Sequence, residues 1–352
     1  MLRRGGWGEE SGRDVFFIAL RDLQWRRRRF IIGVVATGLV FALALLITGM
    51  GASFRNEVRR TVKAMGADSW VVPKGVSGPF TASTAFAASM ADAVAAEPGV
   101  TKASPLAVLR FTVRTPSLRD INVIALEPHG VGAPSPKNGR TLEGTGEAVV
   151  DRSLGLGVGK TLTIGGQPLR IVGKTSGVTF LAGTPTVFIT LEDAQGLAFG
   201  GQKLATSVAT LGVAKRVPPG TRAMSNAAVV TDLQRPLTQA TKTINFLCVL
   251  LWIVAAGIIG SIVYLQAIER VRDFAVLKAT GTTNSSLLAG LAFQAVLLSL
   301  LSAAAAVFLA KLLSPFLAMP AEISAGAYTL LPIIAVIVGL LASLAGLRRA
   351  VG

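Results

Sequence analysis

Four long segments of this chain carry no charged residue, and a long stretch of mixed composition, residues 55–242, separates the first two. The charge-free segments cover residues 30–54, 243–268, 279–310 and 323–347. A helix of about 20 residues crosses the hydrocarbon core of a bilayer, so each segment is long enough to span. Helices of a soluble protein would normally carry charges on their outer face. The pattern therefore predicts a membrane protein with a large domain inserted between its first and second spans.

The first apolar segment could instead be a cleaved signal peptide, since arginines precede it. The charge-free stretch 30–54 is longer than the apolar core of a signal peptide, which has about 7 to 15 residues. The segment before it, 1–29, is also unusually long for a signal peptide. We therefore interpret residues 30–54 as a retained span.

Basic residues near the spans predict the orientation of the chain. They gather in three segments: residues 1–29 with eight arginines, the loop after the second span with Arg270, Arg272 and Lys278, and the tail with Arg348 and Arg349. The loop between the third and fourth spans has Lys311 alone. Because lysine and arginine collect on the cytoplasmic side, both termini are predicted to be cytoplasmic and residues 55–242 to lie outside.

The net charge of +16 does not indicate nucleic-acid binding. Residues 55–242 hold 21 basic and 12 acidic side chains, which are scattered without interleaved aromatic residues. A solvated surface is the first interpretation, and attraction to anionic lipid head groups or wall polymers is the second. The single cysteine, Cys248, lies in the second span, and the single histidine, His129, lies in a loop rich in proline and glycine. A zinc site needs several such ligands, so no metal site or cofactor is predicted in this chain.

The inserted segment is flanked by two apolar helical patterns that we interpret as packed stalks. The first continues the first span at helical spacing, through Phe54, Val58, Val62 and Met65, and Gly66 can cap it. The second leads into the second span at alternating spacings of three and four, through Val230, Leu233, Leu237, Ala240 and Ile244. Pro236 interrupts this second stalk, either as a first-turn residue or as a kink.

Between the two stalks, the sequence contains several short segments typical of β-strands, separated by stretches that contain glycine. They are expected at residues 69–72, 106–114, 148–150, 161–164, 169–172 and 186–189. A helix is expected at 84–96, ended by Pro98 and Gly99, and Gly165 with Gly166 predicts a hairpin between two strands. These elements indicate an α+β part and a small all-β part.

Gly157, Gly159 and Lys160 look like the end of a phosphate-binding loop. That motif needs glycine five positions before Gly159, where this chain has Leu154, and it should open a helix, whereas a strand candidate follows. A turn is the better interpretation. No other segment contains an ATPase motif, a catalytic triad or a metal-binding motif, so the chain is predicted not to be an enzyme.

The segment directly after the second span carries the most specific pattern. It resembles the second cytoplasmic segment of the FtsX/MacB family of ABC transporter permeases, which reads approximately E-R-x-R-E-x-A-x-L-K-A-x-G. Eight positions match: Glu269, Arg270, Arg272, Ala275, Leu277, Lys278, Ala279 and Gly281. Asp273 replaces the usual glutamate, and residues 280–283 depart from the common continuation.

The resemblance extends over the rest of the chain. Residues 19–23 and the arginines after them look like the family's amphipathic elbow, and residues 66–68, 158–161 and 170–173 resemble the MacB-type extracytoplasmic domain. Lys160 stands where that pattern commonly has an acidic residue. The Leu-Lys-Ala-x-Gly segment, with Gln294 downstream, is closest to the DevC-like branch of this type VII superfamily.

The resemblance implies a fold of four transmembrane helices with a MacB-like α+β extracytoplasmic domain between helices 1 and 2. The implied segments are a cytoplasmic amphipathic elbow (1–29), helix 1 (30–54), the extracytoplasmic domain with its stalks (55–242), helix 2 (243–268), a cytoplasmic coupling helix (269–284), helix 3 (285–312), an external loop (313–324), helix 4 (325–347) and a cytoplasmic tail (348–352). The implied location is the bacterial cytoplasmic membrane.

The resemblance also implies a role. In this family the coupling helix docks on a separate ATPase, which binds ATP and Mg; Glu269, Arg272 and Asp273 can pair across that interface and Leu277 can anchor it. The complex would contain two ATPases and two permeases, the second being another copy or a paralogue, with a possible extracytoplasmic adaptor or hydrolase. No charged residue occurs inside any of the four segments 30–54, 243–268, 279–310 and 323–347, which argues against a hydrophilic conduit. We therefore expect mechanotransmission that moves a lipid, lipoprotein, peptide or drug.

Alternatives remain at this point. The coupling segment could be a solvated connector whose basic residues only fix the topology. The chain could be a regulator of wall hydrolases, as FtsX is, or a membrane-anchored sensor without an ATPase. Small residues in the spans permit close packing within one chain or between two, at Ala256 with Gly260, Gly339 with Ser343 and Ala342 with Gly346.

Overall fold

The computed structural model describes residues 27–81, 84–269, 271–272, 276, 279, 284–314, 323 and 325–350. Its contacts divide the chain into two compact units. The first, called the helical unit, comprises Met1–Ser53 and Thr241–Gly352, and the second, called the inserted domain, is Phe54–Ala240. Each unit is described by itself.

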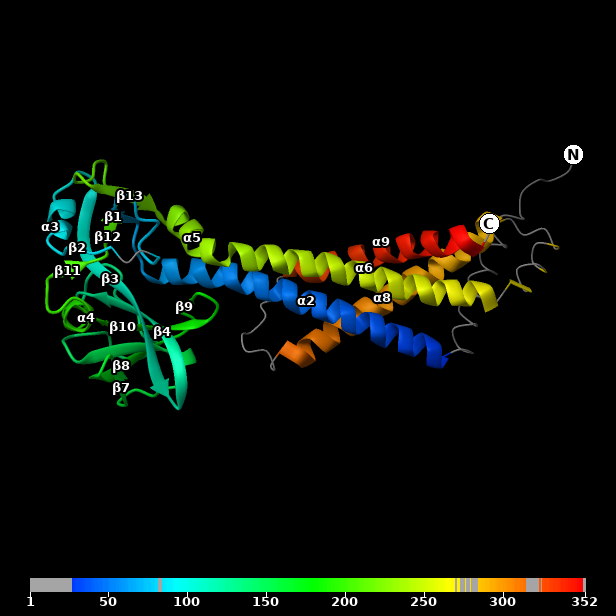
Figure 1. The fold of residues 1–352 in the computed structure, drawn as a ribbon, viewed down its shortest axis with the longest axis horizontal. Coiled ribbons are helices and arrows are strands. Elements are labelled where there is room, and N and C mark those ends of the chain that lie inside the picture. Colours follow the sequence, from blue (N-terminus) through cyan, green and yellow to red (C-terminus); the bar gives the residue numbers. More distant parts are fainter. Residues whose placement is uncertain are drawn as a thin grey trace, which may run out of the picture. The chain divides into compact units, whose positions relative to one another are not determined.

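Four long helices carry the predicted apolar segments. They are α2 (Arg27–Ala64), α6 (Thr238–Glu269), α8 (Asn284–Leu313) and α9 (Ala325–Ala350), and Figure 1 draws them as blue, yellow, orange and red coils. Within the described residues, Phe30–Ala64, Asn226–Glu269 and Ala289–Leu313 are long and apolar enough to cross a membrane, and Ala325–Leu341 is a shorter apolar helix. The prediction of apolar helices on both sides of an inserted domain is confirmed.

The four helices share one apolar core in the helical unit. Phe41 from α2, Ile259 from α6, Leu298 from α8 and Ala335 from α9 are all buried in it. Large apolar side chains on the other faces of the same helices are exposed, including Ile32, Phe246, Ile253, Phe308 and Ile333. In water this pattern would be very unfavourable, whereas lipid chains can cover such faces.

Gly339 allows α9 to approach α8 closely within this one chain. A Cβ added at Gly339 would lie 2.7 Å from Ser299 Oγ and 3.0 Å from the Ala295 carbonyl oxygen, both on α8. Of the two packing modes open for Gly339, the described contacts are therefore intramolecular.

Replacing Gly339 with leucine is expected to lower the free energy of unfolding by about 1 to 3 kcal/mol, because an overpacked side chain must displace backbone. Gly257→Leu is the matched control, since a Cβ at Gly257 meets nothing within 4 Å. Thermal unfolding of the purified protein in detergent would measure both. Equal melting temperatures for the two variants would contradict this close approach.

The inserted domain is built on one 11-stranded sheet. Its path runs β13-β1-β12-β3-β4-β10-β6-β8-β5, with β7 paired to β8 and β9 to β10. The strands are β1 (Ser69–Pro73), β3 (Val100–Thr115), β4 (Ser117–Leu126), β5 (Asn138–Gly139), β6 (Glu147–Asp151), β7 (Thr161–Ile164), β8 (Gln167–Thr175), β9 (Thr179–Phe180), β10 (Thr184–Thr190), β12 (Ser207–Gly212) and β13 (Thr221–Ser225). A second sheet pairs β2 (Phe86–Ala87) with β11 (Leu204–Ala205).

The long strand β3 joins the two parts that the sequence indicated in the inserted domain. Its first half pairs with β12, from Val100 to Leu106, and its second half pairs with β4, from Leu106 to Thr115. Strands from both parts therefore share one continuous sheet. The α+β part and the small all-β part expected from the sequence are therefore joined through β3.

Three helices and two 3-10 turns complete the inserted domain. They are α3 (Met90–Ala95), α4 (Leu191–Ala198), α5 (Asn226–Gln234), η1 (Arg152–Leu154) and η2 (Arg235–Leu237). The helix expected at 84–96 is only partly present, because β2 at Phe86–Ala87 pairs with β11 before α3 begins. The early residues thus gain partners from a distant strand, which outweigh local helix propensity.

Several local predictions are confirmed. Gly165 and Gly166 both have positive φ, 57° and 87°, and connect β7 to β8 in a two-residue hairpin. Gly159, with φ of 86°, lies in a turn that leads into β7 and opens no helix. His129 is exposed in a turn, where its carbonyl oxygen accepts a hydrogen bond from Lys102 Nζ at 2.7 Å.

Candidate functional site

The predicted stalk residues lie where α2 and α5 meet inside the inserted domain. Val58, Val62 and Leu233 are buried in one apolar core, and half-buried Val230 packs against it. Phe54 is buried but lies outside that core. The core also holds Trp70 of β1, so the two helices pack on the sheet as well as on each other.

The apolar helical pattern predicted for the second stalk does not form one continuous α-helix with the second span. Pro236 lies in the first turn of η2, between the end of α5 at Gln234 and the start of α6 at Thr238. Leu237 is half-buried and Ala240 is exposed. A proline cannot continue the hydrogen-bond ladder of a helix, which explains the change of helix type at this position.

Polar side chains fix the position of α5 on the sheet. Trp70 Nε1 donates to Asn226 Oδ1 at 2.7 Å, and Asn226 Nδ2 donates to the Ala67 carbonyl oxygen at 2.7 Å. Asp232 is buried and accepts a hydrogen bond from Thr81 Oγ1 at 2.5 Å. Gly78 passes so close to Asp232 that a Cβ there would clash with its carboxylate.

On α2, Glu57 and Thr61 contact the β9–β10 hairpin. Gly183 N donates to Glu57 Oε1 at 2.7 Å, and Thr61 Oγ1 donates to the Thr179 carbonyl oxygen at 2.6 Å. The three residues of the hairpin loop, Leu181, Ala182 and Gly183, all have positive φ, of 60°, 63° and 83°. Non-glycine residues enter this region at a cost, so the contacts from α2 stabilise a strained loop. Sequence patterns did not indicate this contact.

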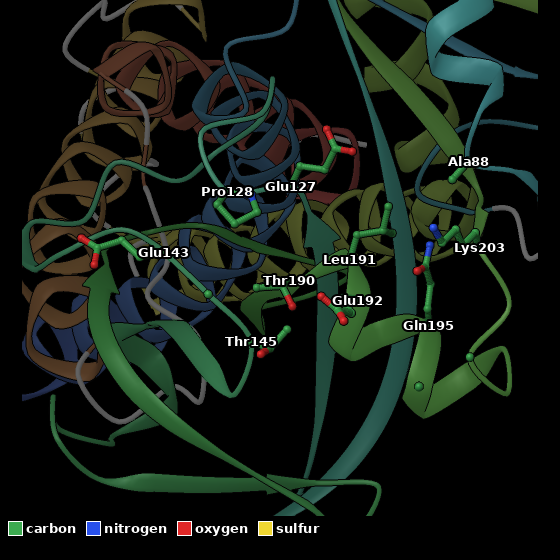
Figure 2. Close-up of a pocket in the computed structure, with 13 residues that line it drawn as sticks. Ala88, Glu127, Pro128, Glu143, Thr145, Thr190, Leu191, Glu192, Gln195 and Lys203 are labelled. Atoms are coloured by element: carbon green, nitrogen blue, oxygen red, sulfur yellow. The ribbon is translucent and has the colours of Figure 1, made fainter.

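The inserted domain also has an open pocket of about 760 Å³ beside α4 (Figure 2). Its charged lining residues are Glu127, Glu143, Glu192 and Lys203. Figure 2 shows Glu192 in the middle of the view, with the carboxylates of Glu127 and Glu143 turned away from each other. Three carboxylates and one ammonium give this pocket a negative balance, which suits a cationic or hydroxyl-rich group.

Buried Asp193 connects α4 to the loop before β6 and to β8. Gly146 N, in the loop before β6, donates to Asp193 Oδ2 at 3.0 Å, and Gln167 Nε2 of β8 donates to Oδ1 at 3.2 Å. At the start of α4, Thr190 Oγ1 donates to Asp193 Oδ2, and Asp193 N donates back to Thr190 Oγ1. This reciprocal cap orders the first turn of α4.

A salt bridge closes the loop that carries Glu143. Arg140 pairs with Glu147 and also with Glu143 at 3.3 Å. The hydrogen bond from Arg140 is the main reason why the pKa of Glu147 falls from 4.5 to about 2. Glu147 therefore stays ionised in the folded domain well below the pH at which it protonates in the unfolded chain.

The stabilisation by Glu147 is expected to depend on pH. A carboxylate with a lowered pKa contributes stability above its unfolded pKa and loses it as the pH falls towards its folded pKa. The difference in unfolding free energy between wild type and Glu147→Gln should be constant above about pH 5 and shrink between about pH 4.5 and pH 2. Denaturant unfolding over this range measures it. Glu97→Gln, which replaces a carboxylate outside this salt bridge, serves as control, and a difference that does not change with pH would contradict the pairing.

The coupling residues lie largely outside the described part of the chain. Glu269 is the last residue of α6, and Arg272 and Ala279 are described as exposed helical residues. The other predicted coupling residues lie outside the described residues: Arg270, Asp273, Leu277, Lys278 and Gly281. In the described residues, no group of three or more histidine, cysteine or acidic side chains can hold a metal ion.

Comparison with known proteins gives the same division of the chain. Residues 31–236 match the MacB-like periplasmic core domain, and residues 245–352 match the FtsX-like permease C-terminal family. Among solved structures, the periplasmic region of MacB from Actinobacillus actinomycetemcomitans aligns with 51% of this chain and 98% of its own, at 12% identity and a TM-score of 0.37. A score this low carries no argument, so family membership is taken from the sequence matches.

Sequence relatives cover nearly the whole chain. An uncharacterized ABC transporter permease of Mycobacterium tuberculosis strain H37Rv is 46% identical over 96% of this chain and 97% of its own. One from Mycobacterium bovis matches at the same level, and a second one of strain H37Rv is 43% identical over the same shares. This chain therefore belongs to the FtsX/MacB-type ABC transporter permeases: it is a multi-pass membrane protein that carries a MacB-like domain outside the cytoplasm and works with an ATPase subunit rather than being one.

Proposed function

We propose that this permease subunit transmits the motion of a separate ATPase to its inserted domain. Two copies of an ATPase, each binding ATP and Mg, would act with two permeases, the second being another copy or a paralogue. The segment after α6 would dock on the ATPase, with Glu269, Arg272 and Asp273 pairing across the interface and Leu277 as an apolar anchor. The site would lie in the cytoplasm, with the protein in the bacterial cytoplasmic membrane.

The observation that carries this proposal is the position of the coupling pattern. It begins at the last residue of α6, and the next described helix, α8, begins at Asn284. Of the eight residues that match the family pattern, one therefore ends α6 and the other seven fall between α6 and α8. A connector that only fixed topology would need basic residues alone, whereas this one also has two acidic residues, alanines and a leucine at fixed spacing.

The absence of charged residues from the four apolar segments favours a cargo that does not pass through a polar channel across the bilayer. Charged groups inside a span usually mark the path of an ion or a polar substrate, and the four apolar segments contain no Asp, Glu, Lys, Arg or His. Export or extraction of a lipid, lipoprotein, peptide or drug from the outer leaflet fits this composition. Within the family, the Leu-Lys-Ala-x-Gly segment and Gln294 favour the DevC-like branch.

Purification with partners in mild detergent tests the proposal. We expect a nucleotide-hydrolysing subunit to co-purify, with ATPase activity in the complex and a lipid or peptide detectable by mass spectrometry. Recovery of a cell-wall hydrolase as the functional partner would favour an FtsX-like regulator instead. A chain that purifies without any ATPase would contradict the proposal and support a sensor.

A further inference from the structure

A groove of about 430 Å³ runs along the contact of α2 with α5 in the inserted domain. Its lining comes from little more than one turn of α2 and from most of the length of α5: Arg59, Val62, Lys63, Asn226, Ala227, Val230, Thr231 and Gln234. The floor is apolar, since Val62 is buried and Val230 is half-buried. The rim on the α2 side consists of two exposed cations, Arg59 and Lys63.

The two cations lie on one face of α2, because residues four apart are neighbours on a helix. In the described part of the chain, neither side chain has an ion pair or a hydrogen bond. The lining residues include no carboxylate. The nearby acidic side chains point elsewhere: Glu57 is buried against Gly183, and Asp232 is buried against Thr81. The groove therefore keeps an uncompensated positive charge.

The start of α5 adds to this positive potential. Asn226 and Ala227 are the first two residues of this nine-residue helix and line the groove. Ser225 Oγ caps the Ala228 N–H, so the contribution of this helix start is that of the helix dipole, whose positive end favours an anion. An arginine can bind phosphate through two parallel hydrogen bonds, and a lysine adds a point charge. Phosphate with an attached apolar part is the chemistry that matches this rim and floor.

The chain position of the groove indicates the source of such a phosphate. Arg59 lies five residues after the charge-free segment 30–54, within the same helix. At 1.5 Å per residue this is about 7 to 8 Å along the helix, comparable with the thickness of one head-group layer, about 5 to 8 Å. A lipid head group at the membrane surface can therefore reach the level of Arg59.

We propose that the groove between α2 and α5 binds the head group of an anionic phospholipid from the leaflet that faces the inserted domain. The phosphate lies between Arg59 and Lys63, the glycerol contacts Val62 and Val230, and the acyl chains stay in the bilayer. This lipid is a resident ligand that holds α2 and α5 together, so the inference goes beyond the proposed transport function.

The test is a titration of the purified full-length protein with palmitoyl-oleoyl phosphatidylglycerol, followed by native mass spectrometry. Arg59→Gln with Lys63→Gln should weaken binding about tenfold or more, since each basic residue near a membrane surface contributes to lipid attraction. Lys215→Gln with Arg216→Gln removes the same charge from an exposed loop of the inserted domain and should leave binding unchanged. Phosphatidylcholine should bind much more weakly than phosphatidylglycerol to the wild type.

A second variant tests whether lipid binding needs the space in the groove as well as its positive charge. Thr231 is exposed and lines the groove, so Thr231→Trp fills the space while keeping Arg59 and Lys63. It should also weaken phosphatidylglycerol binding about tenfold. Equal losses in the two double variants, full binding by Thr231→Trp, or equal binding of both lipids would overturn the proposal. Co-purification of the ATPase is measured separately in each variant, so failure of lipid binding and failure of the transport proposal remain distinguishable.

Discussion

Replacing Trp70 with alanine is expected to lower the unfolding free energy of the inserted domain by about 3 to 5 kcal/mol, as is typical for a large aromatic residue removed from a core. Trp70 is fully buried in β1 and stacks edge-on against Phe80, with ring centroids 5.2 Å apart. Its loss also removes the hydrogen bond from Nε1 to Asn226 Oδ1 on α5. The apolar core beneath α2 and α5 should therefore loosen.

Denaturant unfolding of the purified protein, followed by circular dichroism, would measure this change. Trp70→Phe is the matched control, because it keeps an aromatic ring and removes only the hydrogen bond and part of the volume. It should cost clearly less than Trp70→Ala. If Trp70→Ala unfolded like the wild type, the described core around Phe80 and Val62 could not be the one that holds the domain together.

Long apolar segments and the helical spacing of apolar residues predicted the positions of the long helices. The charge-free segments became α2, α6, α8 and α9, because an uninterrupted apolar run of membrane-spanning length has few alternatives to a membrane helix. Val58, Val62 and Leu233 were predicted from helical spacing and lie buried together. The hairpin at Gly165 and Gly166 followed from turn chemistry that depends on two adjacent residues.

Contacts between distant segments could not be predicted in the same way. Strand β2 exists because Phe86–Ala87 pairs with Leu204–Ala205, at the far end of the inserted domain's sequence, and local propensity instead favoured a helix there. Asp193 combines a helix cap, which its spacing from Thr190 could have indicated, with bonds to Gly146 and Gln167, which it could not. The contact of Glu57 with Gly183 joins α2 to a hairpin 126 residues away.

Removing two acidic residues from the coupling segment is expected to uncouple the transporter. In Glu269→Ala with Asp273→Ala, the ATPase would lose its ionic contacts with the segment after α6, while the apolar helices and the inserted domain would be unchanged. Truncating one partner of a desolvated charge pair at an interface typically costs about 2 to 5 kcal/mol, so ATPase recruitment should fall at least about 30-fold. Glu97→Ala with Asp120→Ala, two acidic residues of the inserted domain, is the matched control.

The most direct measurement of the central claim is the rate of ATP hydrolysis by the ATPase reconstituted with this permease in lipid vesicles. Mechanical coupling through the segment after α6 predicts that ATPase recruitment and the permease-dependent part of the rate are both lost in Glu269→Ala with Asp273→Ala. The Glu97→Ala, Asp120→Ala control should keep the wild-type rate, and unfolding of both variants should match the wild type. Unchanged recruitment and hydrolysis in the coupling variant would contradict the assignment of this segment as the ATPase contact.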